Sequence, residues 1–365
     1  MSTDHVTNFT VGPAKLYHGA TEFLCGQLQR GVGEISHRSK DFSELSEQSL
    51  SAFREFFQVP DEYRVYYTYS ATEGMEILTR SAIDEKSYHI VNGNFGNVWF
   101  KTAGKAQKTA QKLSHDDGKT RVEPEEIQPQ AGTELLAITA NETSTGIAYS
   151  PAEIAALRAR FPELLLGVDV TSSMGAVGYD LSQADAWLFS VQKAFGLPAG
   201  LGILVVGPRV WEKAQSREAA GADVGCHHRL SDLEKKMAGK FQTPTTPNTL
   251  NIGGLGYVCQ RLKADFGSLT ELYTHTQKKA EAIYAFFENH PTLKPAIGSG
   301  RSESIIVVDG DPDELAALHK QLGEAGIEVG KGYGGKKAEQ IRIGNFPVHS
   351  MADFEHLFAQ IGGNT

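Results

Sequence analysis

The sequence has few cysteines and no long hydrophobic run. Its 3 cysteines, Cys25, Cys226 and Cys259, are odd in number and far apart, which argues against a disulfide framework and favours a reducing compartment. No apolar stretch is long enough to span a bilayer, and the first residues lack the charged-then-apolar pattern of a signal peptide. We therefore expect a cytoplasmic protein that does not contact a membrane.

An excess of positive charge is also missing. The formal net charge of -9 at pH 7 argues against a general nucleic-acid binder or a membrane-surface binder. What is present is an ordinary globular composition, with 40% hydrophobic and 22% charged residues. The 365 residues are enough for about two domains, and no internal repeat or low-complexity tract interrupts them.

Nearly continuous apolar runs alternate with helical patterns along the first part of the chain. This alternation is typical of a mostly parallel α/β sheet that is buried on both faces. Ligands of such sheets collect beyond the carboxyl ends of the strands. The expected strands are 64–69, 88–92, 134–140, 164–170 and 187–191. The candidate residues lie at or just beyond their carboxyl ends, and they are Thr72, Phe95, Thr143, Asp169 and Lys193.

Two helix starts and a second α/β unit complete the pattern. Asp41 and Glu44 can form a capping box for the helix that follows them, and Ser150 with Glu153 can form another. After residue 208 the alternation loosens, and a helical run over about 254–290 leads to strands near 303–310 and 340–345, with a last helix from about 350. We expect a second domain from about residue 260.

Lys193 follows the apolar run 187–191 and lies at the start of a glycine-rich loop. The loop leads directly into a second apolar run, 203–206. Burial at a strand end disfavours the ammonium form of a lysine, so that its amine becomes nucleophilic near neutral pH. A lysine that forms a Schiff base needs this property. The same pattern also fits a lysine that extends from the strand end to solvent.

Asp169 ends another apolar strand, 24 positions before Lys193. A buried carboxylate is costly unless it meets a positive group or hydrogen-bond donors. The step from Ser70 to Thr72 into a helix offers free backbone N–H groups to a phosphate, although it also fits a tight turn without a ligand. A lysine, an opposing acid and a phosphate site are what pyridoxal phosphate needs, and Phe95 could stack on its ring.

Six short motifs support this interpretation through their order and spacing along the chain. They are NFTVGPAKL near the start, SHRSKDF, NET, the aspartate before TSS, SVQK with PAGLG after it, and QIRIGN. With them the sequence resembles the phosphoserine aminotransferases, a branch of the class V aminotransferases. The resemblance that they carry extends from about residue 8 to residue 360. The resemblance implies fold type I of the pyridoxal-phosphate enzymes. It also implies serine biosynthesis by transamination between phosphoserine or 3-phosphohydroxypyruvate and glutamate or 2-oxoglutarate.

The resemblance further implies a domain division and a partner. A large cofactor-binding domain would cover residues 15–259 and a smaller α/β domain residues 260–365, with the N-terminal segment 1–14 near the active site. The active sites would be shared between the chains of a homodimer, whose other partners are small amino acids and 2-oxo acids.

Individual residues take roles through the same resemblance. Lys193 would form the Schiff base and move the proton, Asp169 would face the ring nitrogen, Phe95 would stack, and Thr143 would donate to the phenolic oxygen. The cofactor phosphate would be contacted by Thr72, Glu73 through its backbone, Thr171 and Gln192, and by Gln242 and Thr243 of the neighbouring subunit. The substrate would be held by His37, Arg38 and Arg342.

Departures from the family pattern keep a second activity open. Glu73 stands where family members can carry an arginine or a small residue, and a carboxylate facing the pocket would repel a substrate phosphate. Gln242 replaces a more usual asparagine. The alternative is a class V aminotransferase with another amino donor or acceptor, such as serine or alanine with glyoxylate or pyruvate. Cysteine desulfuration is disfavoured because no cysteine follows Cys259. The catalytic pair disfavours a non-catalytic scaffold.

Two further motifs do not fit this chemistry. The glycine-rich run 330–337 is similar to a P-loop, but it lacks the serine or threonine that binds magnesium. Its Lys331 and Tyr333 are instead candidates to line the distal end of the substrate. Cys226, His227 and His228 are metal-ligand types without a second cluster at zinc-like spacing. We therefore expect an ordinary surface loop there and no metal.

Overall fold

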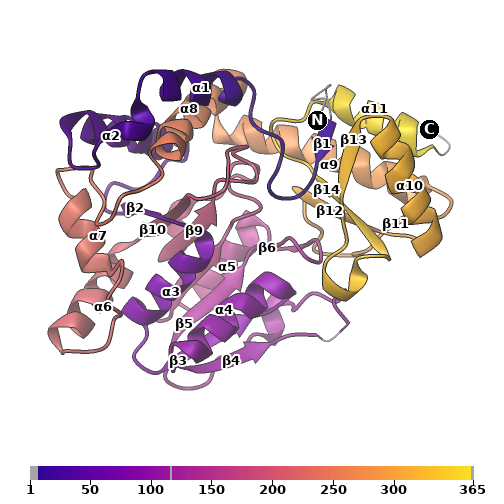
Figure 1. Cartoon of the computed structure of the whole chain (residues 1–365). Helices are drawn as coiled ribbons and strands as arrows, with labels where there is room; N and C mark the ends of the chain where they lie inside the picture. The colour runs from indigo at the N-terminus through magenta and orange to yellow at the C-terminus, as the bar shows by residue number, and fades with distance from the viewer. Residues whose placement is uncertain (1–6, 116, 363–365) are drawn as a thin grey trace.

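The computed structural model describes residues 7–115 and 117–362 of the chain, which form two main β-sheets covered by helices (Figure 1), together with a small two-stranded sheet. The larger sheet has seven strands in the order β2-β10-β9-β8-β5-β3-β4. In that order they are Arg64–Thr68, Gly202–Val206, Ala186–Ser190, Leu165–Asp169, Thr133–Thr139, Lys86–Ile90 and Thr109–Leu113. The five strands expected from the apolar runs are confirmed, with ends that shift by one or two residues.

The larger sheet is mostly parallel, as expected. Strands β9, β8, β5, β3 and β4 run parallel to their neighbours, whereas β10 pairs antiparallel with both β9 and β2. All residues of β8, β9 and β10 are buried, which explains their continuous apolar sequences. Parallel neighbours end at the same edge, so residues that follow β8 and β9 are brought together there.

Helices cover both faces of the larger sheet. The helices α3 (Ala71–Ala82) and α4 (Asn94–Lys105) lie across one face, and α6 (Pro208–Ala219) packs against α3. Helix α5 (Pro151–Arg160) begins at the expected Ser150 capping box, which is confirmed. The other expected capping box is wrong, because α2 (Lys40–Phe56) begins earlier and is capped by Ser39.

The smaller sheet joins the start of the chain to its end. Its strands are ordered β1-β13-β14-β12-β11, which are Thr7–Phe9, Ile327–Lys331, Gln340–Gly344, Ile305–Asp309 and Lys294–Pro295. The helices α9 (Leu269–Asn289), α10 (Pro312–Glu324) and α11 (Met351–Ile361) contribute to a second hydrophobic core with this sheet. Strand β1 pairs parallel with β13, and residues 1–6 of the predicted N-terminal segment lie outside the described residues.

The helical run expected over 254–290 is two helices. Helix α8 (Thr249–Phe266) ends at Gly267, whose φ of 75° lies in the left-handed region, and α9 begins after Ser268, which caps it. A glycine at this point interrupts the helix without the strain that a side chain would add. Residue 260, where the sequence suggests a second domain, lies inside α8.

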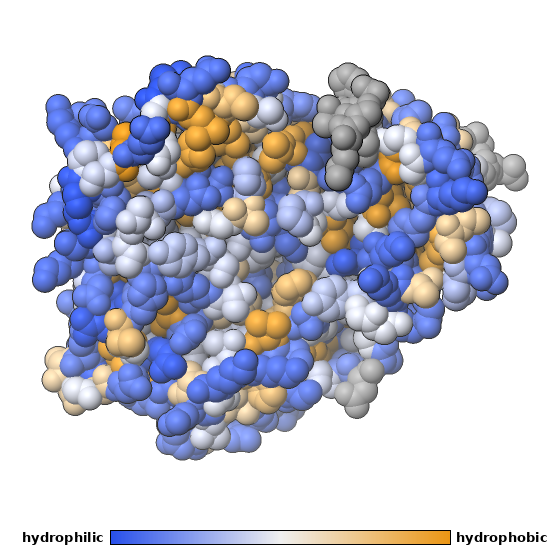
Figure 2. Space-filling view, viewed as in Figure 1, coloured by the Kyte–Doolittle hydropathy of each residue, from blue (hydrophilic) through white to orange (hydrophobic). Residues whose placement is uncertain are grey.

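The remaining elements are short or peripheral. They are α1 (Ala20–Gln29), α7 (Leu230–Met237), β6 (Asn141–Glu142), β7 (Ile147–Ala148) and the 3₁₀ turns η1 (Val32–Glu34), η2 (Pro124–Glu126), η3 (Leu181–Gln183) and η4 (Gly334–Lys336). Figure 2 shows a mainly hydrophilic face with hydrophobic residues gathered over α1 and α8, where Leu28 is 55% exposed. In the described part of the chain, no helix is long and apolar enough to cross a membrane.

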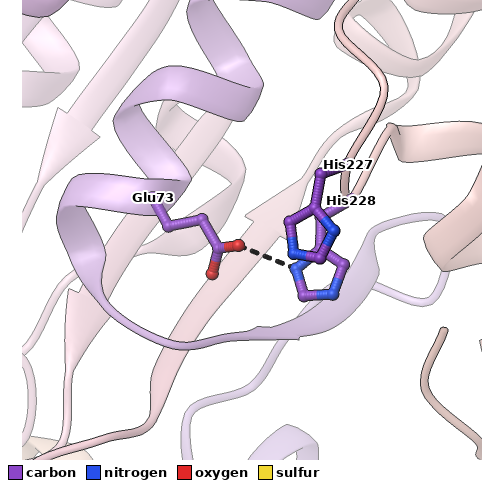
Figure 3. Close-up of side chains that lie close together, drawn as sticks. All are labelled: Glu73, His227 and His228. Atoms are coloured by element: carbon purple, nitrogen blue, oxygen red, sulfur yellow. Dashed lines mark hydrogen bonds and ion pairs between the residues drawn. The ribbon is translucent and has the colours of Figure 1, made fainter. Parts of the chain in front are cut away.

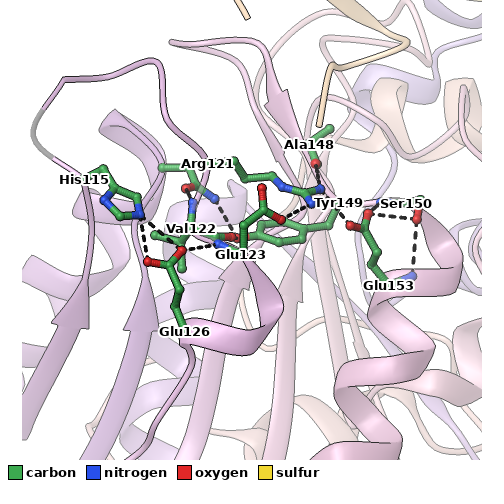
Figure 4. A network of polar contacts seen from close by, with 10 residues as sticks. His115, Arg121, Val122, Glu123, Glu126, Ala148, Tyr149, Ser150 and Glu153 are labelled. Carbon is green, nitrogen blue, oxygen red and sulfur yellow. Dashed lines mark hydrogen bonds and ion pairs between the residues drawn. The ribbon is translucent and has the colours of Figure 1, made fainter. Parts of the chain in front are cut away.

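A network around Arg121 fastens the segment after β4 to α5 (Figure 4). The guanidinium donates to the carbonyl of Ala148 over 3.2 Å and pairs with Glu153 at 2.8 Å. It also lies 5.1 Å from the centre of the Tyr149 ring, whose hydroxyl donates to the carbonyl of Val122. Because these partners come from separate segments, the network joins residues 121–122 to residues 148–149 and to the first turn of α5.

Candidate active site

A cavity of about 380 Å³ opens at the carboxyl edge of the larger sheet. Most of the residues that the sequence singles out line it together, although they come from distant segments. These are Thr72, Phe95, Thr143, Asp169, Thr171, Gln192, Lys193 and Arg342. Residues 11–13, which follow β1, line the same cavity. The smaller sheet therefore contributes to the site through both β14 and the chain's first strand.

Lys193 follows β9 and is only 7% exposed, so it does not extend to solvent. Its amine donates to the hydroxyl of Thr143 over 2.7 Å. Burial lowers the pKa of Lys193 to about 8, and the charges of Asp169 and Glu142 partly offset that effect. A side chain at Gly12, where φ is 140°, would place its Cβ 3.1 Å from the Cε of Lys193. The glycine thus makes room for the lysine.

Asp169 is the last residue of β8 and is 2% exposed. Burial raises the pKa of its carboxyl to about 6, against hydrogen bonds from Thr171 and the charge of Lys193, which lower it. The backbone N–H of Thr171 donates to Oδ1 over 2.9 Å and the Thr171 hydroxyl over 2.5 Å. In the same cavity, the buried hydroxyl of Thr139 has no hydrogen-bond partner among the described residues, so a polar ligand could satisfy it.

Two aromatic rings form one wall of the cavity. Phe95 lies in the first turn of α4, and the amine of Lys193 is 5.1 Å from the centre of its ring. The Tyr333 ring lies 5.9 Å from the Phe95 ring, and its hydroxyl accepts a hydrogen bond of 3.0 Å from Asn94. Tyr333 therefore faces the site, whereas Lys331 lines a different cavity beside α10.

Glu142 is a residue of this region that the sequence analysis did not single out, although it lies within the NET motif. It is 0% exposed. One carboxylate oxygen accepts from the backbone N–H groups of Phe95 and Gly96, over 2.9 and 3.0 Å. The other oxygen accepts from the backbone and the hydroxyl of Ser144. Glu142 thus fixes the start of α4 and, with it, the position of Phe95.

Arg342 approaches the cavity from β14. Its guanidinium donates to the carbonyl of Thr143 over 3.1 Å and to that of Lys331 over 2.8 Å. The guanidinium carbon also lies 5.5 Å from the centre of the Tyr333 ring. Burial lowers the pKa of Arg342, but an arginine stays protonated, so the group brings a fixed positive charge to the pocket.

Ser70, Ala71 and Thr72 at the start of α3 line the cavity, and because the backbone N–H of Ala71 donates to the hydroxyl of Ser190, Thr72 is the residue of this turn that can offer a backbone donor to a ligand. Glu73 does not line it. The Glu73 backbone N–H donates to the hydroxyl of Ser70 over 3.2 Å. Its carboxylate lies 2.8 Å from Nδ1 of His228 and accepts from the backbone of Tyr69 over 2.5 Å (Figure 3). The repulsion that motivates the alternative activity therefore has no geometric basis.

Four other predicted site residues lie together outside the cavity of their own chain. Arg38 donates to the carbonyls of Thr243 and Pro244, over 2.5 and 2.9 Å. Gln242 donates to the carbonyl of Arg38 over 3.3 Å. The nearby His37 ring nitrogen is 3.3 Å from the hydroxyl of Thr246. We call His37, Arg38, Gln242 and Thr243 the loop cluster. Within one chain it does not meet Lys193.

At the carboxyl edge of this sheet a buried amine, a buried carboxylate and a guanidinium line one cavity, as expected for an aminotransferase of fold type I, the architecture of the pyridoxal-phosphate enzymes. The family model for class-V aminotransferases matches residues 10–352. The chain therefore belongs to the class-V aminotransferase family.

Known proteins resemble the chain over nearly its whole length. The crystal structure of a phosphoserine aminotransferase from Cytophaga hutchinsonii is 33% identical, with a TM-score of 0.92, and the match covers 97% of this chain and 98% of that one. The phosphoserine aminotransferase of Nocardioides sp. is 27% identical, covering 97% and 94%. A ureidoglycine–glyoxylate aminotransferase structure from Bacillus subtilis, at 18% identity and a TM-score of 0.83, covers 99% and 93% and shows the shared fold alone.

Proposed function

We propose that this chain is a phosphoserine aminotransferase of serine biosynthesis. It would exchange an amino group between phosphoserine or 3-phosphohydroxypyruvate and glutamate or 2-oxoglutarate. The observation that carries the proposal is the convergence of Lys193, Asp169, Thr143 and Arg342 on one cavity. The relatives at 33% and 27% identity, which are phosphoserine aminotransferases, support this substrate pair.

The cavity's donor set fits pyridoxal phosphate, which supplies a carbonyl that condenses with amines and a ring that accepts electrons. Lys193 would condense with the carbonyl, and Asp169 would face the ring nitrogen. Thr143 would donate to the phenolic oxygen, and Phe95 would cover one face of the ring. The phosphate would take donors from the first turn of α3 at Thr72 and from Thr171 and Gln192, in keeping with the anion preference of a helix start.

Glu73 would contribute to the phosphate site only as part of the first turn of α3, and its side chain would not contact the phosphate. Its backbone N–H donates to Ser70 and its carboxylate faces His228, so its charge stays away from a bound phosphate. This arrangement leaves a dianionic substrate acceptable in the pocket. It removes the reason for preferring serine or alanine as the amino donor.

Lys193 would move the proton at the substrate's α-carbon. With its pKa lowered to about 8 by burial, a useful fraction of the amine is neutral at working pH and can act as a base. Asp169, with a pKa of about 6, is mostly ionised at neutral pH and can hold a proton at the ring nitrogen. The 2.7 Å hydrogen bond to Thr143 aims the amine into the cavity.

Arg342 would bind the α-carboxylate of either substrate through its planar guanidinium, a fit that lysine does not reproduce. The distal phosphate or carboxylate needs a second cationic site. We propose that His37 and Arg38 supply it from the partner subunit of a homodimer, together with Gln242 and Thr243 at the cofactor phosphate. The hydrophobic surface over α1 and α8 in Figure 2 supports burial against a second copy.

Two organisational statements belong to the same proposal. The chain would divide into a large domain, 15–259, and a small domain, 260–365. The second hydrophobic core, which apart from Phe9 draws its buried residues from 283–357, supports the small domain. Residues 11–13 of the N-terminal segment line the cavity. Cytoplasmic location is supported by the three cysteines, which are free thiols.

A steady-state transamination assay tests this function. The cofactor-loaded enzyme is supplied with 2-oxoglutarate and with phosphoserine, serine or alanine as the amino donor. We expect kcat/KM for phosphoserine to exceed that for serine or alanine by at least about tenfold, since one charge-assisted hydrogen bond contributes about that factor. Equal or better turnover of the unphosphorylated amino acids would refute the proposed substrate.

A further inference from the structure

The loop that contains Cys226, His227 and His228 lies beside the first turns of α3, where Glu73 projects toward it. Figure 3 shows the Glu73 carboxylate directed at the two imidazole rings. One ligand atom from each of Glu73, His227 and His228 lies within 4.8 Å of the other two. The fold thus supplies, from α3, one carboxylate ligand that lies outside the sequence around His227.

His228 has the surroundings that a metal-binding histidine requires. Its side chain is buried, with Nδ1 2.8 Å from the Glu73 carboxylate and Nε2 2.9 Å from the Thr245 hydroxyl. A ligating histidine characteristically has its second ring nitrogen held by an oxygen, which fixes the ring's orientation. The Thr245 hydroxyl is itself 2.8 Å from the Tyr69 hydroxyl, so this outer partner is also held in place.

Glu73 is equally constrained. Its Oε2 accepts from the backbone of Tyr69 over 2.5 Å, which leaves Oε1 facing Nδ1 of His228. A cation at this point would take the position of the proton that the two groups share. The carboxylate and imidazole are already oriented toward each other, so little side-chain order would be lost on binding.

His227 adds the third ligand from the solvent side. Its ring stacks on that of His228, with centroids 4.0 Å apart and an angle of 17° between the planes. The residue is exposed, so rotation of its side chain can bring a ring nitrogen to the same ion. A neighbouring cavity of about 540 Å³, lined by all three residues, leaves room for water to complete the coordination.

We propose that Glu73, His227 and His228 bind a Zn²⁺ ion. Two imidazoles, one carboxylate and an open position form a donor set that suits zinc, whereas Mg²⁺ and Ca²⁺ prefer oxygen ligands. The ion joins the loop of residues 223–228 to α3. Its ligand Glu73 directly follows Thr72, which lines the same cavity as Lys193. The site is independent of the proposed transamination and can be tested on protein without cofactor or substrate.

Zinc titration of chelator-treated, reduced protein by isothermal calorimetry tests the proposal. We expect one ZnCl₂ per chain, a higher melting temperature in its presence, and no comparable binding of MgCl₂. His227→Ala should weaken zinc affinity at least about tenfold, since the loss of even a group that only orients a ligand has an effect of that size. Because His227 is exposed, this variant should fold, and circular dichroism checks that it does.

Matched variants separate this site from other zinc-binding groups. Glu76→Gln alters a carboxylate that lines the same cavity but pairs with Arg80, and it should keep the wild-type affinity. Cys226→Ser should keep it too, whereas Glu73→Gln should lose it. Absence of saturable binding, equal affinity in His227→Ala and wild type, or loss of binding in Cys226→Ser alone would overturn the proposal.

Discussion

The amine of Lys193 lies 2.7 Å from the hydroxyl of Thr143, and both side chains are buried at the edge of the larger sheet. The two residues are 50 positions apart in the sequence and meet because β9 and β5 belong to the same sheet. The contact directs the amine into the cavity rather than out to solvent. The predictions below concern this amine and the groups that surround it.

Removal of the lysine's charge should change how stability depends on pH. The pKa of Lys193 is about 8 in the folded chain and 10.5 ordinarily. Between these two pH values the amine is protonated in the unfolded chain and neutral in the folded chain. Stability should therefore rise with pH above about 8. Between pH 7 and 9.5, the free energy of unfolding of cofactor-free wild type should increase by about 2 kcal/mol relative to that of Lys193→Met, at about 1.4 kcal/mol per pH unit. Urea unfolding of both proteins at each pH measures this difference. A pH-independent difference would contradict the burial of this charge.

Arg342→Lys should lower kcat/KM for phosphoserine by roughly 10- to 100-fold, because an ammonium cannot reproduce two parallel hydrogen bonds to a carboxylate. The matched control is Lys331→Arg, since Lys331 lines the cavity beside α10 instead. Steady-state kinetics on both variants checks the assignment. Wild-type efficiency in Arg342→Lys would mean that the α-carboxylate binds elsewhere.

The loop cluster should act across subunits. Lys193→Ala and Arg38→Ala should each be severely impaired as pure proteins. After the two variants are unfolded and refolded together in equal amounts, about a quarter of wild-type activity should return, because half of random dimers are mixed and each has one intact site. Wild type refolded alone sets the scale. If the mixture is no more active than its components, Arg38 does not serve the partner's site.

Glu142→Gln should loosen the start of α4. Each carboxylate oxygen accepts two hydrogen bonds, so either orientation of the amide places its NH₂ against donors. A buried donor left unpaired costs about 1–3 kcal/mol, and the affinity for pyridoxal phosphate should fall because Phe95 moves. The control is Glu126→Gln, at an exposed position of the network in Figure 4, which should change the free energy of unfolding by less than about 0.5 kcal/mol. Urea unfolding and cofactor titration compare the two variants, and equal results would contradict the positioning role.

The strands were predictable where burial leaves a clear trace in the sequence. The apolar runs of β8 and β9 identify two buried neighbours, and parallel pairing then brings Asp169 and Lys193 to one edge. The glycine-rich loop after Lys193 was equally visible. In these places local sequence and final environment agree, because hydrophobic burial on both faces dictates both.

Other features depend on contacts between distant segments, which the residue pattern does not reveal. Glu142 reads as an ordinary polar residue after a strand, and only the approach of α4 shows that it is buried and fully paired. The partner of His228 comes from α3, more than a hundred positions earlier in the chain, with a separation of 155. The start of α2 was misplaced because Ser39 competes with Asp41 for the capping position, and both fit the local rule.

The most direct test of the account is chemical labelling of the lysine. The cofactor-loaded enzyme is reduced with borohydride, digested and mapped by mass spectrometry, with Lys193→Ala treated in parallel. We expect a phosphopyridoxyl group on the peptide that contains Lys193 and none on the variant. A stable label on another lysine, or equal labelling of the variant, would contradict the assignment of Lys193.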